Sequence, residues 1–397
     1  MTARIVVLSG VRTPIGDIGG SLSPVLALDL ATHAIRGAIA AADLDPSVVE
    51  YTDFGWVAQD PRATNLARMA AEQAGVPYTA PGTTWHENCN SGGAAIHGLA
   101  RRLALGEQQV GVAGGVESMS NVGRYLFGGR TGGQLYGDLK LVDGLFGALT
   151  DPLVGGGELA GLITERMVDR YGLSREEQDD IAFRSHQAAL RAWDAGHFQG
   201  HVLSVEVPTK RGKSTLVTRD EHPRPLDRAQ FAQARPYFKP DGGTITGLNA
   251  SSLNDGAAAL VLSTAEWAEA HGIHPLAELV AWRNVGVERA YMGEGAFKVI
   301  PPLLARAGVS LQDVDLFELN EAFAAVLAAA YRHLPGLSPD KVNLWGSGIS
   351  LGHPVGATGA RQVVDMVHML GHRDQELGVT TRCVGGGIGG GELIRRL

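Results

Sequence analysis

Strand-like and helix-like segments alternate along the chain, and the alternation occurs twice. In the first half, we expect strands over 5–10, 54–57, a short run into Cys89, 109–115 and a late edge strand over 257–263, and helices over 26–42, 64–74 and 91–105. In the second half, we expect strands over 277–287, 315–319, 342–347 and 376–387, and helices over 297–307, 322–334 and 356–370. Strands that alternate with helices of about 10–15 residues indicate parallel sheets covered by helices. The chain is therefore predicted to be a duplicated α/β protein.

The composition is that of an ordinary globular protein, with 44% hydrophobic and 19% charged residues. At 397 residues the chain is expected to form two or three domains. No apolar run approaches the roughly 18 residues of a membrane span, and a net charge of −8 argues against nucleic-acid binding. Because the chain opens on a strand-like run without an export signal, we expect a cytoplasmic location and no structural disulfide.

The middle of the chain, roughly 121–250, is glycine-rich and is expected to be an irregular insertion over the site, for example in GGRTGG (128–133). One helix is predicted over 174–195, with Ser174 as its N-cap and Glu177 three residues later. Between residues 209 and 239 there are eight Lys or Arg and three acidic residues. Basic residues gathered in this way can hold a phosphorylated ligand, although a solvated loop would have the same composition.

Cys89 and His353 occupy equivalent points in the two halves. Each follows the third strand of its half and precedes a helix rich in Gly and Ala. Active sites of α/β folds form at the carboxyl ends of strands, beside helix N-termini. One half is thus predicted to supply a nucleophile and the other a base. The alternative is a chance similarity of two generic strand–helix units.

Four local patterns suit catalysis. A helix N-terminus and a nearby imidazole are expected to lower the pKa of the Cys89 thiol. His353 lies at a tight turn where it can act as a general base, and Asn320 follows a buried strand where its amide can hold a water or an oxyanion. Cys383 precedes Gly385–Gly387, which permit close backbone approach and leave N–H groups free. The structural alternatives are two buried apolar cysteines, a core histidine and an ordinary helix cap, and no His or Cys spacing indicates a metal site.

Seven segments, taken in order along nearly the whole chain, resemble the sequence blocks of the thiolase superfamily. They are VRTPIG (11–16), ENCNSGG (87–93), GGVESMS (114–120), NASSLNDGAAA (249–259), NEAFA (320–324), GHPVGATG (352–359) and CVGGGIG (383–389). The resemblance implies a five-layered α/β/α/β/α fold with an inserted loop domain, usually in a dimer or tetramer. Residues 1–120 with 251–272 would form the N-terminal half, 121–250 the loop domain and 273–397 the C-terminal half.

The implied reaction is thiolytic cleavage of a 3-ketoacyl-CoA, as in fatty-acid β-oxidation, or the reverse Claisen condensation. Coenzyme A would be a substrate, with no covalently bound cofactor. By this resemblance, Cys89 would be the acylated nucleophile, His353 its activating base and Cys383 the acid or base for the enolate. Asn320 would hold a water that joins His353 in binding the enolate oxygen. The backbone N–H groups of Cys89 and Gly385 would bind the acyl-enzyme oxyanion.

The same resemblance implies several coenzyme A contacts. Ser251 would contact the pantetheine arm, with Phe238, Met292 and Phe323 shaping its slot. Arg224 would be a candidate for the nucleotide phosphates.

The chain departs from the family pattern over the acyl pocket. Leu159 and Ala160 stand where a His or Met pair is common, so specificity for a short acetoacetyl group does not follow. A ketoacyl synthase or an HMG-CoA-synthase-like enzyme would share the nucleophile, but the first would have a second His in place of Asn320. A non-catalytic acyl-CoA-binding relative would lack the nucleophile or the base. A zinc- or disulfide-linked structural protein would contain bound metal or would have no free thiol.

Overall fold

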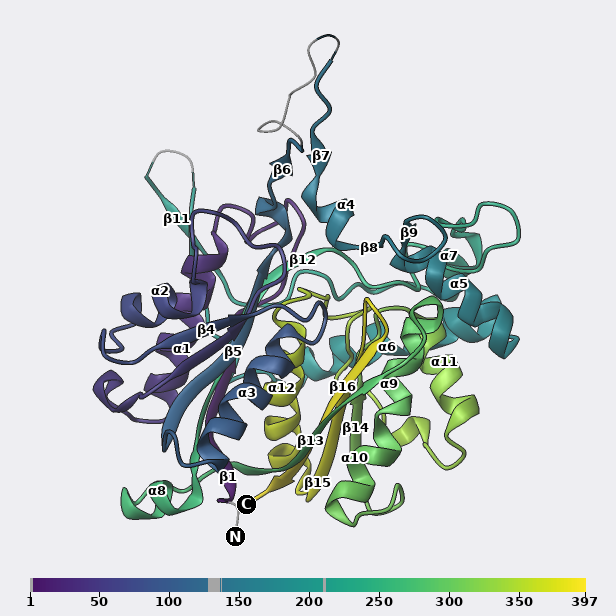
Figure 1. Ribbon diagram of the computed structural model, residues 1–397. Coiled ribbons are helices and arrows are strands. Elements are labelled where there is room, and N and C mark those ends of the chain that lie inside the picture. Colours follow the sequence, from purple (N-terminus) through teal and green to yellow (C-terminus); the bar gives the residue numbers. More distant parts are fainter. Residues whose placement is uncertain (1–2, 128–135, 137, 210–211) are drawn as a thin grey trace.

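The computed structural model describes residues 3–127, 136, 138–209 and 212–397. In these residues ten strands form one sheet in the order β14-β15-β16-β13-β1-β12-β5-β3-β4, with β2 (Gly16–Asp17) attached to β12 (Figure 1). The N-terminal strands are β1 (Ile5–Arg12), β3 (Thr52–Gly55), β4 (Gly82–Trp85), β5 (Val110–Ser118) and β12 (Asn254–Thr264). The C-terminal strands are β13 (Ala277–Gly286), β14 (Leu316–Leu319), β15 (Leu377–Val384) and β16 (Ile388–Arg396).

Helices divide the molecule into five layers. The outer face of the N-terminal strands is covered by α1 (Ala27–Ala41) and α2 (Leu66–Gln73), and the outer face of the C-terminal strands by α9 (Gly295–Lys298) and α10 (Ile300–Ala307), beside α11 (Ala324–His333). Between the two groups of strands, α3 (Ser91–Ala104) packs against α12 (Thr358–Arg373) (Figure 1). The predicted duplicated α/β/α/β/α fold is therefore confirmed. No helix in the described part of the chain is long and apolar enough to cross a membrane.

The prediction of parallel sheets is wrong for most of the strand pairs. The parallel pairs are β3–β4, β3–β5 and β14–β15, whereas β12 runs antiparallel to both of its main neighbours, β1 and β5. The segment 257–263 is thus an interior strand, not the predicted edge strand. Strand β16 was not predicted from the sequence. It forms an antiparallel hairpin with β15 across Gly385–Gly387.

The strand predicted over 342–347 does not form. Val342 makes an isolated bridge to Phe317, but the next residue, Asn343, has a left-handed backbone conformation with φ +53°. The Asn343 side chain accepts a hydrogen bond from the N–H of Leu319 and donates one to its carbonyl, both at 2.9 Å. A side-chain amide therefore makes the hydrogen bonds that a strand ladder would have made.

The inserted segment contains more regular structure than its composition indicates. The predicted helix is present as α6 (Arg175–Asp194), with the capping box of Ser174 and Glu177. The sequence missed α5 (Ala160–Tyr171), α4 (Gly144–Ala148), α7 (Arg228–Gln233) and three small hairpins. These hairpins are β6 (Arg124–Tyr125) with β7 (Val142–Asp143), β8 (Thr150–Asp151) with β9 (Glu158–Leu159), and β10 (Val205–Pro208) with β11 (Ser214–Val217).

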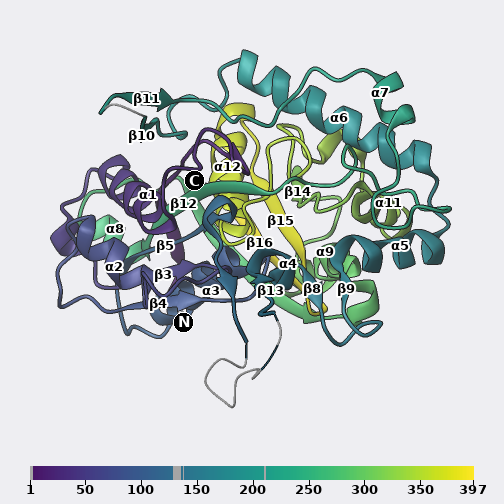
Figure 2. The ribbon, with the colours of Figure 1, turned by 90° about the horizontal axis from the view of Figure 1, so that it is seen from above.

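Viewed from above, α5 and α6 lie beside α11, and the β10–β11 hairpin lies beside α1 (Figure 2). The segment GGRTGG and two residues of the basic segment, Lys210 and Arg211, lie outside the described residues. The proposed domain boundaries stay a prediction.

A buried ion cluster joins the two halves to the inserted segment. The guanidinium of Arg12 is fully buried; it donates two hydrogen bonds to Asp220, at 2.8 and 3.0 Å, and one to Asp365 of α12, at 2.9 Å. Burial alone would raise the pKa of the Asp365 carboxyl, but the charge of Arg12 and the hydrogen bond to His201 lower it well below its ordinary value. Arg12 therefore compensates the charge of both buried carboxylates, and Arg361 contributes at Asp365, 3.6 Å away.

We expect Arg12→Met to lower the free energy of unfolding by about 3–5 kcal/mol, because it leaves two buried carboxylates without this partner. Urea denaturation followed by circular dichroism measures the change. Arg4→Ala is the matched control, because Arg4 forms an ion pair with Glu278 at 2.9 Å but its side chain is 57% exposed. The control should cost less than about 1 kcal/mol. Equal losses for the two variants would contradict this account of the cluster.

Candidate active site

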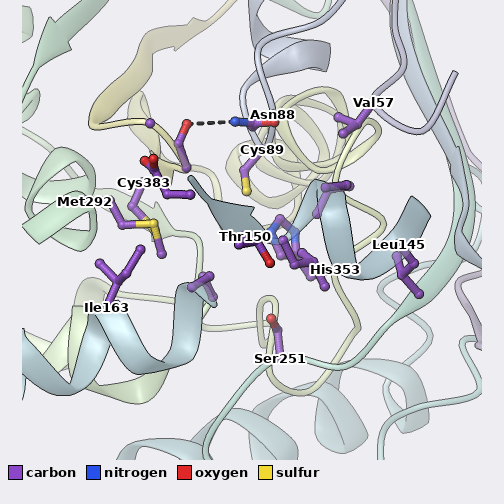
Figure 3. A pocket seen from close by; sticks show the side chains of 18 of the residues that line it. Val57, Asn88, Cys89, Leu145, Thr150, Ile163, Ser251, Met292, His353 and Cys383 are labelled. Atoms are coloured by element: carbon purple, nitrogen blue, oxygen red, sulfur yellow. Dashed lines mark hydrogen bonds between the residues drawn. The ribbon is translucent and has the colours of Figure 1, made fainter. Parts of the chain in front are cut away.

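A mostly apolar cavity of about 170 Å³ lies where the inserted segment meets the ends of the central strands. Cys89, His353 and Cys383 all line it, although they come from segments far apart in the sequence (Figure 3). Cys89 precedes α3, His353 precedes α12, and Cys383 is near the end of β15. The structure thus brings to one cavity the cysteine and the histidine that the sequence predicts as nucleophile and base.

Cys89 lies in a tight turn just before α3. Ser91 is the first residue of the helix, and its N–H and hydroxyl both donate to the Asn88 carbonyl, at 2.9 and 2.7 Å. The Cys89 side chain is half-buried because it faces the cavity. The sequence thus places the thiol at a helix N-terminus, as predicted.

The predicted direction of the Cys89 pKa is wrong. Burial raises the pKa of the thiol to about 11, although the backbone N–H groups of Gly385 and of Cys89 itself act to lower it. Desolvation of the thiolate outweighs the hydrogen bonds and the helix N-terminus here. At neutral pH Cys89 is therefore a thiol, which would need a base to remove its proton in order to act as a nucleophile.

His353 has the protonation state of such a base. Burial, with a smaller contribution from the charge of Arg361, lowers the pKa of His353 to about 3. The imidazole ring is therefore neutral at neutral pH. Its Nδ1 lies 2.6 Å from the hydroxyl of Thr358, and that hydroxyl donates to the carbonyl of Pro354 at 3.0 Å. Because the hydroxyl proton is used in this way, Nδ1 is assigned as the donor and Nε2 as the unprotonated acceptor.

Two asparagines orient His353. Asn254, the first residue of β12, accepts a hydrogen bond from the backbone N–H of His353 at 2.8 Å. The Nδ2 of Asn320 lies 3.4 Å from the His353 Nε2, so this amide faces the nitrogen that carries the free lone pair. Asn320 follows β14 directly, as predicted, and is buried.

Cys383 is buried near the end of β15, with Gly385 and Gly386 of the following turn also lining the cavity. Burial, followed by the nearby Cys89, raises the pKa of this thiol well above its ordinary value. The second thiol therefore retains its proton at neutral pH and is able to act as an acid.

The structure brings most of the other predicted contact residues to the cavity. Ala160, Ser251, Met292 and Phe323 line it. Phe238 is not among the described lining residues, but its ring packs edge-on against that of Phe323 with centroids 6.2 Å apart.

Leu159 and Arg224 also lie outside the described lining of the cavity. Leu159 is the second residue of β9, immediately before the cavity-lining Ala160. The backbone N–H of Arg224 donates to the Nδ1 of His186 at 3.3 Å. Burial alone would raise the pKa of Asp17, but the hydrogen bond and charge of His222 and the charge of Arg224 lower it.

Several cavity residues were not predicted from the sequence. Leu145 of α4, Leu149 at the end of that helix and Thr150 of β8 line the cavity. Figure 3 shows Leu145 and Thr150. Asp151 accepts a hydrogen bond from Arg289 at 2.9 Å, which ties the inserted segment to the C-terminal half at the cavity. The residues from 145 to 151 lie in a glycine-rich region without strong hydrophobic periodicity. The short apolar run before Thr150 is the one sequence signal that could have indicated them.

Glu117 of β5 is a further buried carboxyl that lines the cavity. It accepts hydrogen bonds from the backbone N–H groups of Val57, Ala58 and Gly356, at 3.1–3.2 Å. Burial nevertheless raises its pKa to about 7. Because the bonds reach two other segments of the chain, 57–58 and 356, Glu117 holds walls of the cavity together.

Neither cysteine is cross-linked. Among the residues that the structure describes, no group of three or more His, Cys, Asp or Glu side chains could hold a metal ion.

Comparisons with known proteins agree with this geometry. Residues 5–266 match the model of the thiolase N-terminal domain, and residues 273–396 match that of the thiolase C-terminal domain. The chain is 41% identical to beta-ketothiolase BktB of Cupriavidus necator, with all of both chains covered, and 39% identical to the cytosolic acetyl-CoA acetyltransferase of Rattus norvegicus, with 99% of this chain and 98% of the relative covered.

Two solved structures are similar over nearly their whole length. The acetyl-CoA acetyltransferase of Bacillus anthracis has a TM-score of 0.96 at 38% identity. The match covers 100% of this chain and 99% of that structure's chain. Human mitochondrial 3-ketoacyl-CoA thiolase in complex with CoA has a TM-score of 0.95 at 34% identity, with coverages of 100% and 98%. The chain therefore belongs to the thiolase family and is an acyltransferase.

Proposed function

We propose that this thiolase transfers acyl groups through Cys89, by cleaving a 3-ketoacyl-CoA with coenzyme A or by the reverse condensation. The observation that carries the proposal is the convergence of one thiol, one neutral imidazole and a second thiol on the same apolar cavity. A relative with this fold has been solved in complex with CoA. The arrangement supplies a nucleophile, a base and an acid from three separate segments.

In the first half-reaction, the Cys89 sulfur attacks the 3-keto carbon while its proton passes to the Nε2 of His353. The N–H groups of Cys89 and Gly385 bind the oxyanion that forms. The bond between C2 and C3 then breaks, its electron pair forms an enolate, and Cys383 protonates that enolate at carbon. Asn320 and His353 stabilise the enolate oxygen, directly or through a water. The products are acetyl-CoA and an acyl group on Cys89.

In the second half-reaction, the thiol of coenzyme A attacks the acyl group on Cys89. Its proton passes to the Cys383 thiolate, and the leaving Cys89 sulfur recovers a proton from the protonated His353. Both cysteines and the imidazole thereby return to their initial states. The two half-reactions share one site, so the kinetics should be of the ping-pong type.

The cavity walls suggest how the substrate is held. We propose that Ser251, Met292 and Phe323 contact the pantetheine arm, with Phe238 supporting Phe323. Ala160, with Leu159 before it, gives this wall a small apolar side chain, which favours acyl groups larger than acetyl. Arg224 would lie farther out, at the nucleotide end. Coenzyme A serves as a substrate, and we further propose a homodimer or homotetramer in the cytoplasm.

A panel of 3-ketoacyl-CoA substrates of increasing length and branching, each with coenzyme A, tests the proposal. We expect loss of the magnesium-enolate absorbance, with kcat/KM highest for a substrate longer than acetoacetyl-CoA. Absence of turnover for every substrate, in a protein that still binds coenzyme A by calorimetry, would reject the reaction and favour a non-catalytic acyl-CoA-binding role. A maximum at acetoacetyl-CoA would reject the interpretation of Ala160.

A further inference from the structure

Asn88 joins the turn that carries Cys89 to the turn that carries Gly385. Its side-chain Nδ2 donates to the Gly385 carbonyl oxygen at 2.8 Å, across 297 residues of sequence and between the two halves of the fold (Figure 3). Asn88 also lines the cavity. The hydrogen bond therefore connects the residue next to the nucleophile with the residue proposed to supply an oxyanion-binding N–H.

The backbone of Asn88 is shaped for this contact. It has φ +44°, a left-handed conformation that asparagine tolerates better than most residues with a Cβ atom. Its carbonyl is fixed by the N–H and the hydroxyl of Ser91, and that hydroxyl accepts a hydrogen bond from the N–H of Glu87 at 2.9 Å. The start of α3 thus holds Asn88 rigidly, with its amide directed at Gly385.

The Gly385 turn needs such a support. Gly386 and Gly387 follow with φ +94° and +82°, so three consecutive glycines connect β15 to β16. Glycine has more backbone freedom than other residues. Gly387 is anchored by its N–H to Val384 at 3.1 Å and by its carbonyl to the N–H of Val287 at 2.8 Å. Among the described residues, Asn88 is the partner that the structure gives to the Gly385 carbonyl.

We infer that Asn88 is a positioning residue for acyl transfer. By holding the Gly385 carbonyl, it fixes the backbone of this turn so that the Gly385 N–H points at the oxyanion formed when Cys89 attacks. The inference rests on the proposed function. It adds Asn88 to the residues of the site, with an amide that acts on the oxyanion-binding backbone of Gly385 and not on the thiol of Cys89. Precise placement matters because hydrogen bonds to a developing oxyanion are sensitive to small displacements.

Two reactions of the same cysteine separate this role from a structural one. Acylation of Cys89 by an acyl-CoA forms an oxyanion, whereas alkylation by iodoacetamide is a displacement that forms none. The readout is the ratio of the two rate constants at one pH, both followed on the Cys89 peptide by mass spectrometry. A change in the reactivity of the thiol alters both rates, but misplacement of the Gly385 N–H lowers acylation alone.

The main variant is Asn88→Gly, which keeps the left-handed backbone and removes the amide. We expect acylation to fall by about 10–100-fold while alkylation stays within about twofold of the wild type. Asp43→Gly is the matched control, because Asp43 is an exposed residue with φ +54° outside the cavity lining. It should leave both rates unchanged.

Asn88→Asp is the second variant, because a carboxylate keeps the shape of the side chain but cannot donate to the Gly385 carbonyl. Any change in the thiol caused by its charge cancels in the ratio, so the ratio should fall as it does for Asn88→Gly. An unchanged ratio in both variants would overturn the inference, as would an equal loss of acylation and alkylation. Absence of any acyl group on Cys89 in the wild type would instead contradict the proposed function itself.

Discussion

Cys89→Ala should lower the turnover of a 3-ketoacyl-CoA with coenzyme A by about 10⁴-fold or more. The variant removes the sulfur that we propose receives the acyl group, and no other described thiol in the cavity adjoins a helix N-terminus. Steady-state kinetics with the best substrate of the panel measure the loss. Binding of coenzyme A by calorimetry is the control, because the thiol is half-buried and its removal should leave the cavity walls in place. Residual activity within about a hundredfold of the wild type would exclude Cys89 as the nucleophile.

Cys383→Ser should separate the two halves of the reaction. The serine hydroxyl fills nearly the same space but gives up its proton far less readily than a thiol, so carbon–carbon bond cleavage should fall by about 10²–10⁴-fold. Acylation of Cys89 by acetyl-CoA alone needs no proton at carbon. The departing coenzyme A sulfur can leave as a thiolate with little help from the proton of Cys383, so this rate should fall by less than about tenfold. The first rate comes from the enolate assay and the second from quenched-flow mass spectrometry. If the substitution abolished acylation as well, the division of work between the two cysteines would be wrong.

The residues of the candidate site could be placed from the sequence because each lies in a short segment whose glycines and prolines determine its local structure. Cys89 precedes a small-residue helix, and His353 lies in a Gly-Pro turn before α12. Cys383 precedes three glycines that turn the chain back into β16. The helix α6 could be placed for the same reason, since its capping box is contained within four residues.

Features that depend on distant contacts were missed. The segment 257–263 has the composition of any strand, and its interior position follows from pairing with β1 and β5. The absence of a strand over 342–347 depends on the bonds between Asn343 and Leu319. The hydrogen bond between Asp151 and Arg289 joins residues 138 positions apart. No hydrophobic periodicity around either residue places it at the cavity.

The pKa of Cys89 shows the same limit in energetic terms. A helix N-terminus and an imidazole are visible in the sequence, and both favour a thiolate. The desolvation that outweighs them depends on how tightly the two halves and the inserted segment enclose the thiol, which is a property of the packed fold. The mechanism that we propose therefore begins not from a preformed thiolate but from a thiol that loses its proton to His353 during attack.

The measurement that tests the account most directly is the location of the acyl group after brief incubation with acetyl-CoA alone. Peptide mass spectrometry of the acid-quenched, digested protein should find an acetyl group, about 42 Da, on the peptide that contains Cys89 and none on the peptide that contains Cys383. Acetylation of Cys383 in place of Cys89, or of neither cysteine in a protein that turns over 3-ketoacyl-CoA, would contradict the central claim.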